Sequence, residues 1–293
     1  MKIDNITTPR GPRSWIVLDI ESAVLDDTAH RRYQQMERWV PSDEKPIRRG
    51  YQRAEDPLTC PRWVFQTITT AAMMVLVEDA QGGVDVQRFV TLSAPDHSER
   101  EVLTGILQVL ADAPADAELC TWMGLAHDAP LIINGCVQHG LTLPHGWRWL
   151  AHGGFHKDRH IDLARAYTGG MRMKPIHLAE VLAVMDIPGK LTCPPFAVTN
   201  LIYAGRWDDL QSACEVDVIS TALLLARWRR LTDPRAEADA VEDRILRRVI
   251  QLREGRGYIA ALEAHRERRF GKKLAEAAND AAVLAAWLTQ DAA

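Results

Sequence analysis

The sequence of 293 residues has few cysteines and no long hydrophobic run. Its five cysteines are widely scattered and include no C-x-x-C pair, so neither a disulfide framework nor a structural zinc site is predicted. No stretch approaches the roughly 20 apolar residues that are needed to span a bilayer. Residues 1–13 are polar and contain no apolar signal core. These absences predict a cytoplasmic protein with no membrane partner.

A strong excess of charge of either sign is also missing. The chain has 35 Lys+Arg against 39 Asp+Glu and is 47% hydrophobic, which is typical of globular domains. The near balance argues against a protein that coats nucleic acid through bulk charge alone. A phosphate-binding loop is absent as well, because Val184 stands where the glycine five residues before Gly189-Lys190 would be required. The sequence therefore does not support an ATP site.

The pattern of apolar residues in the first part of the chain predicts three antiparallel strands. Residues 14–20 (SWIVLDI) favour a buried strand, and residues 63–77 and 84–92 favour two more strands joined by a turn at 81–83. Between the first two strands, residues 26–61 are charged and rich in proline, which predicts an insertion that forms a lid or a binding loop.

Helices and strands alternate further along the chain. Ser98 followed by Glu101 is typical of a capping box at the start of a helix. Further strands are expected at 117–122 and 159–163, and further helices at 129–139, 175–185 and 208–231. This order predicts an α/β fold with a sheet of mixed direction. We expect this domain to cover residues 1–233 and a helical C-terminal extension to cover 234–293.

Four acidic residues are candidates for chemistry. Asp19 and Glu21 stand at positions i and i+2 at the end of the first strand, so alternation places both side chains on one face. Asp128 lies between a predicted strand and a predicted helix. Asp217 lies in the apolar helix 208–231, where an unpaired charge is costly. Each position also has an ordinary interpretation: solvated charges at a strand end, a helix N-cap, or an ion pair with arginine.

The order of these acids resembles a known superfamily. An apolar strand that ends in D-I-E, an aspartate that opens a helix, and an aspartate in a late helix are similar to the pattern of the DEDD 3′–5′ exonucleases. Within that superfamily, the chain looks like the predicted exonucleases related to the proofreading domain of family B DNA polymerases. The residues that carry this closer resemblance are His160-Ile161-Asp162-Leu163, Ile187-Pro188-Gly189-Lys190 and Cys214-Glu215-x-Asp217-Val218. The resemblance covers about Trp15 to Leu231.

The resemblance implies a ribonuclease H-like fold, a mixed five-stranded sheet flanked by helices, and a specific chemistry. Two Mg²⁺ or Mn²⁺ ions would support hydrolysis of phosphodiester bonds from a 3′ end. Asp19 would bridge the ions, Glu21 and Asp217 would complete the first site, and Asp128 would hold the second. The implied substrate is single-stranded or frayed DNA, with RNA as an alternative.

The sequence departs from the superfamily at the position of the water-orienting residue. A tyrosine four residues before the last aspartate, or a histidine five before it, is replaced here by Ala213 and Ser212. Positioned acid–base help is typically worth ~10²–10⁴-fold in rate. Cys214, Glu215, Tyr203 or a histidine from a neighbouring loop are candidates to replace it, and the sequence does not select among them.

Several side chains outside the acids are candidates for nucleic-acid contact. Residues 244–273 contain ten Lys/Arg against three Glu, which indicates either a basic patch or a solvated helix face. Two tryptophans after a Pro-His-Gly turn are candidates for base stacking. The candidate contacts are Arg266, Arg268, Arg269, Lys272, Lys273, Lys157, Arg159, Trp147 and Trp149.

Three functions are therefore compatible with the sequence. The first is a metal-dependent 3′–5′ exonuclease. The second is a module that keeps the exonuclease fold but binds nucleic acid or a protein with weak catalysis. The third is a phosphoesterase for free nucleotides, which would need a small closed pocket. The C-terminal helices are also a candidate surface for association of copies of the chain.

Overall fold

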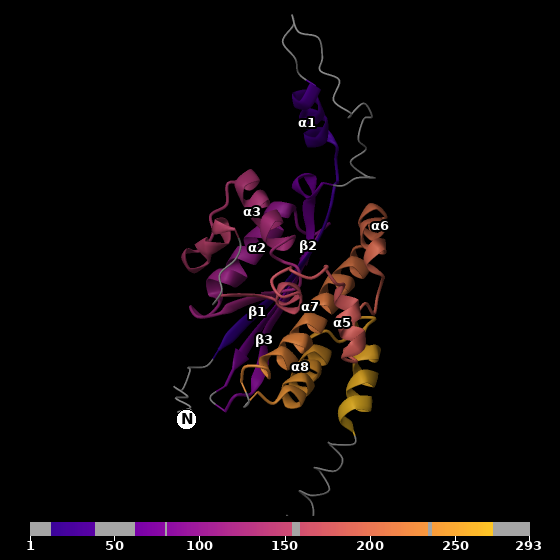
Figure 1. Ribbon diagram of the computed structural model, residues 1–293. Coiled ribbons are helices and arrows are strands. Elements are labelled where there is room, and N and C mark those ends of the chain that lie inside the picture. Colours follow the sequence, from indigo (N-terminus) through magenta and orange to yellow (C-terminus); the bar gives the residue numbers. More distant parts are fainter. Residues whose placement is uncertain (1–12, 39–61, 80, 154–158, 234–235, 272–293) are drawn as a thin grey trace, which may run out of the picture.

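The computed structural model describes residues 13–38, 62–79, 81–153, 159–233 and 236–271 (Figure 1). Its centre is one five-stranded sheet of order β3-β2-β1-β4-β5. The strands are β1 (Ser14–Ala23), β2 (Thr67–Glu78), β3 (Val84–Ser93), β4 (Glu118–Thr121) and β5 (His160–Asp162). β2 pairs antiparallel with both β1 and β3, whereas β4 is parallel to β1 and β5 is parallel to β4. The predicted mixed α/β sheet is confirmed.

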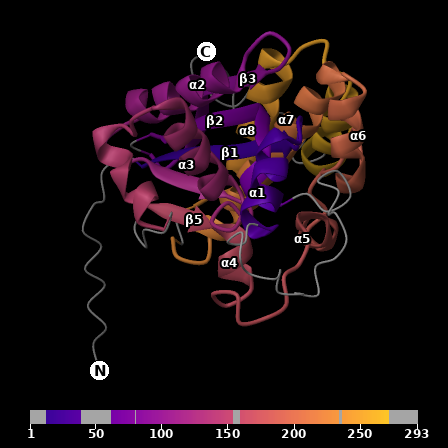
Figure 2. The ribbon, with the colours of Figure 1, turned by 90° about the horizontal axis from the view of Figure 1, so that it is seen from above.

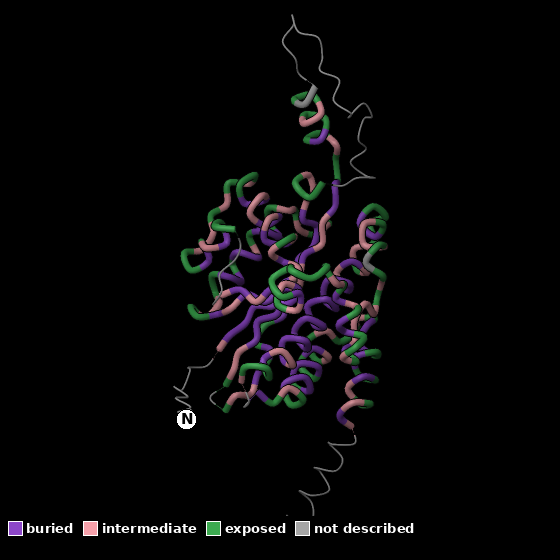
Figure 3. The backbone as a smooth tube through the Cα atoms, in the orientation of Figure 1, coloured by how far each residue is buried: buried purple, intermediate pink, exposed green. Residues whose placement is uncertain are grey.

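Alternating side chains of β1 serve two separate hydrophobic layers. Ile16, Leu18 and Ile20 pack on one face of the sheet, and Trp15 and Val17 pack on the other. All five are at most 3% exposed, and burial of such a side chain stabilises the fold by roughly 1.5–3 kcal/mol. β1 is the middle strand of the sheet, so both of its faces are covered, which explains the apolar run at residues 15–18. Figure 3 shows buried residues, in purple, concentrated in the centre of the molecule.

Helices cover both faces of the sheet. On one face lie α2 (Glu99–Asp112) and α3 (Asp128–His139), and on the other lie α7 (Trp207–Arg229) and α8 (Ala238–Leu252), as Figure 2 shows from above. The predicted capping box begins α2, because Ser98 Oγ accepts from the Glu101 amide and Glu101 accepts from the Ser98 amide. No helix in the described part of the chain is long and apolar enough to cross a bilayer.

Smaller elements lie between these strands and helices. They are α1 (Thr28–Arg38), α4 (Leu163–Tyr167), α5 (Leu178–Val184), α6 (Val198–Tyr203) and the 3-10 turns Trp63–Phe65, His145–His152 and Pro195–Ala197. Two expectations need correction. The predicted insertion begins with a helix, α1, in which His30 packs edge-on against Phe65 at 5.3 Å between ring centres; its remainder, 39–61, lies outside the described residues. The predicted strand at 63–77 begins later, at Thr67, because residues 63–65 form a 3-10 turn.

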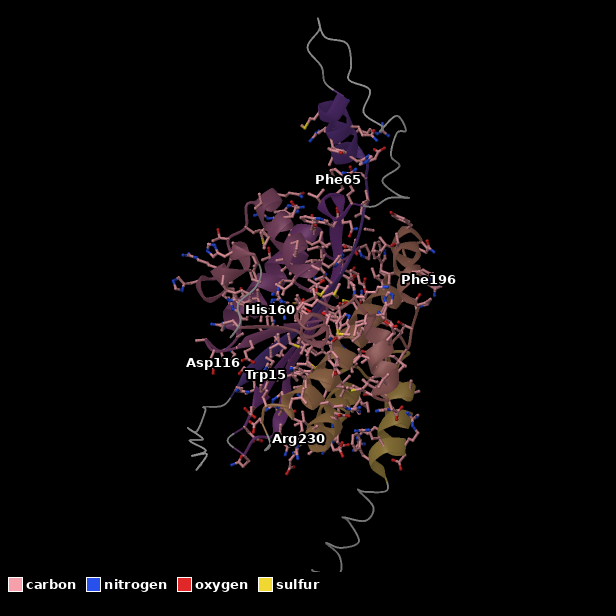
Figure 4. All side chains as sticks on the ribbon, viewed as in Figure 1. Trp15, Phe65, Asp116, His160, Phe196 and Arg230 are labelled. Atoms are coloured by element: carbon pink, nitrogen blue, oxygen red, sulfur yellow. The ribbon has the colours of Figure 1, made fainter. Side chains whose placement is uncertain are left out.

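The region after α7 packs onto the sheet. Val241 and Ile245 of α8 share a hydrophobic cluster with Trp15 and Val17 of β1. Residues 259–271 form another helix, and its Phe270 belongs to the same cluster. The described part of the C-terminal extension therefore shares the core of the sheet. Figure 4 shows Trp15 within the sheet layer and the exposed Phe196 at the outer side, beside α6.

Candidate metal centre

Four acidic side chains meet at a cleft of about 590 Å³. Asp19 and Glu21 come from β1, Asp128 is the first residue of α3, and Asp217 lies near the middle of α7. The topology explains the opening, because β4 pairs only with residues 15–17 of β1 before its chain turns away. The carboxyl end of β1 is therefore uncovered on that side, in the kind of crevice where open α/β sheets bind ligands. The structure brings together all four acids selected from the sequence.

Burial and mutual repulsion disfavour ionisation of these acids. Burial, then repulsion from Glu21 and Asp217, raises the pKa of Asp19 well above its ordinary value. The same two effects, burial first and then Asp217, raise the pKa of Glu21 from 4.5 to about 8. Burial is also the largest cause of the raised pKa values of Asp128 and Asp217. The cluster therefore favours a neutralising cation or bound protons.

The donor atoms suit a hard divalent cation. Asp19 Oδ2, Asp128 Oδ2 and Asp217 Oδ1 are buried without a hydrogen-bond partner. Carboxylate oxygens are the ligands that Mg²⁺ and Mn²⁺ prefer. Cys214 Sγ lies within 4.8 Å of ligand atoms of Asp19 and Glu21, but burial raises the pKa of this thiol well above its ordinary value. Its thiol instead contacts the Asp19 carbonyl oxygen at 3.4 Å, and Cys214 does not line the cleft.

Lys190 is a member of the site that reasoning from the sequence missed. Its Nζ donates to Asp217 Oδ2. Burial opposes the charge of this ammonium, but the attraction of Asp217, Asp19 and Glu21 raises its pKa overall. Lys190 has a left-handed backbone with φ +52°, and the preceding loop is tied to α7 by a 2.7 Å bond from Ser220 Oγ to the Pro188 carbonyl oxygen. The lysine thus supplies one positive charge to the acidic cluster.

The structure narrows the candidates for the water-orienting group. Glu215 is fully buried and accepts from Tyr258 Oη at 2.8 Å, and it does not line the cleft. Tyr203 Oη donates to the Val24 carbonyl oxygen at 3.1 Å and also lies outside the cleft lining. Among the described residues that line the cleft, the histidines are His127 and His177. His127 Nδ1 lies 3.1 Å from Asp128 Oδ1, and this hydrogen bond raises the pKa of His127.

The two tryptophans proposed for base stacking are placed differently. Trp147 is 3% exposed and its Nε1 donates to the Leu110 carbonyl oxygen at 2.6 Å, so it is a core residue. Its predicted stacking role is therefore wrong in this structure. Trp149 is half-buried and packs against Trp147 and His160. Arg159 donates to the Ala117 carbonyl oxygen, and Lys157 lies outside the described residues.

The arginines of the basic segment make ion pairs within the chain. Arg266 Nε donates to Asp243 Oδ1 at 2.7 Å, and Arg269 pairs with Asp239 at 3.0 Å. Arg268 is 61% exposed and lies 3.5 Å from an exposed aspartate, Asp186. None of these three arginines lines the cleft, and residues 272 and 273 lie outside the described residues. Nucleic-acid binding by this segment stays a prediction.

Residues 61–265 match a family model described as a predicted 3′–5′ exonuclease related to the exonuclease domain of PolB. The chain belongs to this family. The matched part contains Asp128, Lys190 and Asp217 and starts after Asp19 and Glu21, which the structure places at the same cleft. It also runs past Leu231, where the sequence resemblance was expected to end, and includes α8.

Solved structures of two kinds are similar to the chain. The family B DNA polymerase from the hyperthermophilic archaeon Pyrobaculum calidifontis is 15% identical at a TM-score of 0.43, with 83% of this chain and 29% of that chain covered. Exonuclease I is 10% identical at a TM-score of 0.35, with 76% and 42% covered. The complex named ExoI/SSB-Ct is 10% identical at 0.35, with 75% and 46% covered. The chain thus spans less than half the length of each. No curated protein matches it.

Proposed function

We propose that this member of the exonuclease family is a metal-dependent 3′–5′ exonuclease that hydrolyses single-stranded or frayed DNA with two Mg²⁺ or Mn²⁺ ions. The observation that carries the proposal is the meeting of four carboxylates at one cleft, three of which have a buried oxygen without a hydrogen-bond partner. Clustered carboxylates that are unfavourable to ionise without a cation, and that bound cations stabilise, are typical of such catalytic sites.

In this proposal each acid has a defined role. Asp19 would be shared by the two ions, Glu21 and Asp217 would complete the first site, and Asp128 would hold the second. When bound, the ions stabilise negative charge on the attacking and the leaving oxygen of a phosphodiester. Lys190, already paired with Asp217, lowers the net negative charge that the phosphate of the substrate meets.

Other residues of the cleft are suited to holding the end of a strand. Trp122 and Ile176 provide apolar surface on the cleft lining that holds the carboxylates, as expected for a site that accepts a base next to a phosphate. His127 and His177 line the same cleft, and we assign to one of them the orientation of the attacking water that Ala213 and Ser212 cannot perform.

A nuclease assay with end-labelled strands tests the proposal. We expect 5′-labelled single-stranded DNA to give a ladder of shortened products and 3′-labelled DNA to release mononucleotide at once. Both reactions should require Mg²⁺ or Mn²⁺ and stop in EDTA. A circular single strand is the control and should stay intact. RNA of the same sequence, run in parallel, decides between the two nucleic acids. Shortening from the 5′ end, or cleavage of the circle, would contradict the proposal.

A second candidate function follows from the missing tyrosine and histidine. Ala213 is 7% exposed and does not line the cleft, so it cannot contact an attacking water. A chain with the metal site but without that help would bind a strand and hydrolyse it slowly. Tight binding of a single strand with no shortening over hours in Mn²⁺ would favour this binding module over the exonuclease.

A further inference from the structure

Asp162, the last residue of β5, is a buried carboxylate with three backbone donors. It is 6% exposed. Its Oδ1 accepts from the amides of Met123 at 3.1 Å and Arg165 at 3.1 Å, and its Oδ2 accepts from the amide of Leu125 at 3.0 Å. Both oxygens are thus occupied by the protein itself. Asp162 does not line the cleft, so it is not placed to hold an ion there.

Two of these donors belong to the loop that leads from β4 to Asp128. Parallel pairing sets Thr121 of β4 opposite Asp162 of β5, so the loop starts beside the carboxylate. Met123 has a left-handed backbone with φ +62°, which a residue with a side chain rarely adopts without support. A Cβ atom on Gly124 would lie 2.4 Å from Thr121 Oγ1, so the loop folds back closely over the end of β4.

Backbone hydrogen bonds connect this loop directly to the start of α3. The His127 amide donates to the Met123 carbonyl oxygen at 3.1 Å, and the Ala129 amide donates to the Gly124 carbonyl oxygen at 2.8 Å. The side chain of His127, the N-cap residue of α3, makes no capping bond. The start of α3, and with it the orientation of Asp128, therefore depends on the loop that Asp162 holds at Met123 and Leu125.

We propose that Asp162 is a positioning residue, which acts on the metal centre by fixing the loop that places Asp128. The inference rests on the proposed function, because it gives Asp128 the role of a metal ligand. A carboxylate is needed because it presents two acceptor oxygens to two amides. An asparagine keeps one acceptor oxygen and turns an NH₂ group toward the other amide, and an alanine keeps neither.

The test compares Asp162→Ala and Asp162→Asn with the parent. Loss of groups that orient metal ligands typically lowers metal affinity or activity by ~10–100-fold. We expect Asp162→Ala to lose Mn²⁺ affinity in calorimetry, and turnover on a single strand, by a factor in that range, with the KM for the strand nearly unchanged. Asp162→Asn should lie between Asp162→Ala and the parent. Amide exchange at Met123 and Leu125 should accelerate in the same order.

Ser98→Ala is the matched control, because it removes the N-cap of α2 without touching this loop. It should lower the melting temperature but leave Mn²⁺ affinity and turnover as in the parent. A folded Asp162→Ala with parental Mn²⁺ affinity and turnover would overturn the inference. If the alanine variant does not fold, parental values in Asp162→Asn overturn it instead.

Failure of the proposed function gives a different pattern. A parent that binds Mn²⁺ but leaves DNA intact refutes the exonuclease, and the Mn²⁺ affinities of the variants still decide the role of Asp162. A parent that binds no Mn²⁺ refutes both the exonuclease and the positioning role.

Discussion

Replacement of Glu21 by glutamine tests whether ionisation of the acidic cluster destabilises the folded protein when no metal is bound. The pKa of Glu21 is raised from 4.5 to about 8, first by burial and then by Asp217. Between these two values the folded protein binds a proton that the unfolded chain does not. The free energy of unfolding therefore falls as the pH rises through this window.

The size of the effect follows from the pKa. A shift of one pKa unit is worth about 1.4 kcal/mol, so the rise in the pKa of Glu21 from 4.5 to about 8 corresponds to a loss of about 5 kcal/mol in the free energy of unfolding. The parent in EDTA should lose stability of this order between about pH 5 and pH 9. Glu21→Gln carries no titrating group at this position, so it should lose much less and should be the more stable protein at pH 9.

The assay is urea denaturation of both proteins in EDTA at several pH values. Glu254→Gln makes the same chemical change at an exposed position and should follow the parent. With saturating Mg²⁺ at high pH, the parent should instead be more stable than Glu21→Gln. A bound cation stabilises the ionised carboxylate of residue 21, and only the parent has a carboxylate at that position. Parallel pH profiles for the parent and Glu21→Gln in EDTA would refute the reasoning.

Three further substitutions test other parts of the site. Asp19→Ala should abolish the rise in melting temperature on adding Mn²⁺, yet melt no lower than the parent in EDTA because one repelling carboxylate is gone; a parental Mn²⁺ response would contradict its role as a ligand. Lys190→Met should lower the melting temperature in EDTA, because Asp217 loses its cation. It should raise Mn²⁺ affinity in calorimetry by up to about 1000-fold, since a unit charge at ~4 Å contributes about 4 kcal/mol at an effective dielectric constant near 20; an unchanged affinity would show that the ammonium does not compete with metal. Ala213→Tyr should lower the melting temperature and leave turnover no higher than in the parent, because Ala213 is buried and does not line the cleft; a raised turnover would show that a tyrosine at this position reaches the attacking water.

The elements of the sheet were predictable because their signals are local. The apolar run at the start of β1 predicts a strand that is buried on both faces, and the period of two along a strand puts Asp19 and Glu21 on one face near its end. The capping box of α2 involves residues only three apart. Helix α1 was not expected, because its anchoring contact, from His30 to Phe65, lies between segments that are distant in the chain.

Parts of the site depend on tertiary contacts that no local pattern contains. Lys190 meets Asp217 only after the loop from α5 folds onto α7. Asp162 and the loop before Asp128 meet because β4 and β5 pair in parallel. Both Lys190 and Asp162 stand in motifs that carry the family resemblance, but the resemblance does not state their roles.

Trp147 and the basic segment 244–273 were candidates for nucleic-acid contact, but the structure gives Trp147 and Arg266 partners within the chain. Trp147 follows a turn and looks exposed, yet the Leu110 carbonyl oxygen satisfies its indole and permits burial. Arg266 belongs to a segment with an excess of positive charge, yet Asp243, just before that segment, lies 10% exposed and takes it as a partner. The sequence contained one signal that basic residues of this segment are paired within the chain. Asp243 and Arg247 are four residues apart on one helix, and they form an ion pair.

The most direct test of the account is digestion of 5′-labelled single-stranded DNA by the parent and by Asp19→Asn, each in Mg²⁺ and in EDTA. The account predicts stepwise shortening by the parent in Mg²⁺, and no shortening by Asp19→Asn or by either protein in EDTA. Equal shortening by the parent and Asp19→Asn in Mg²⁺ would contradict the claim that the four clustered carboxylates are the catalytic site.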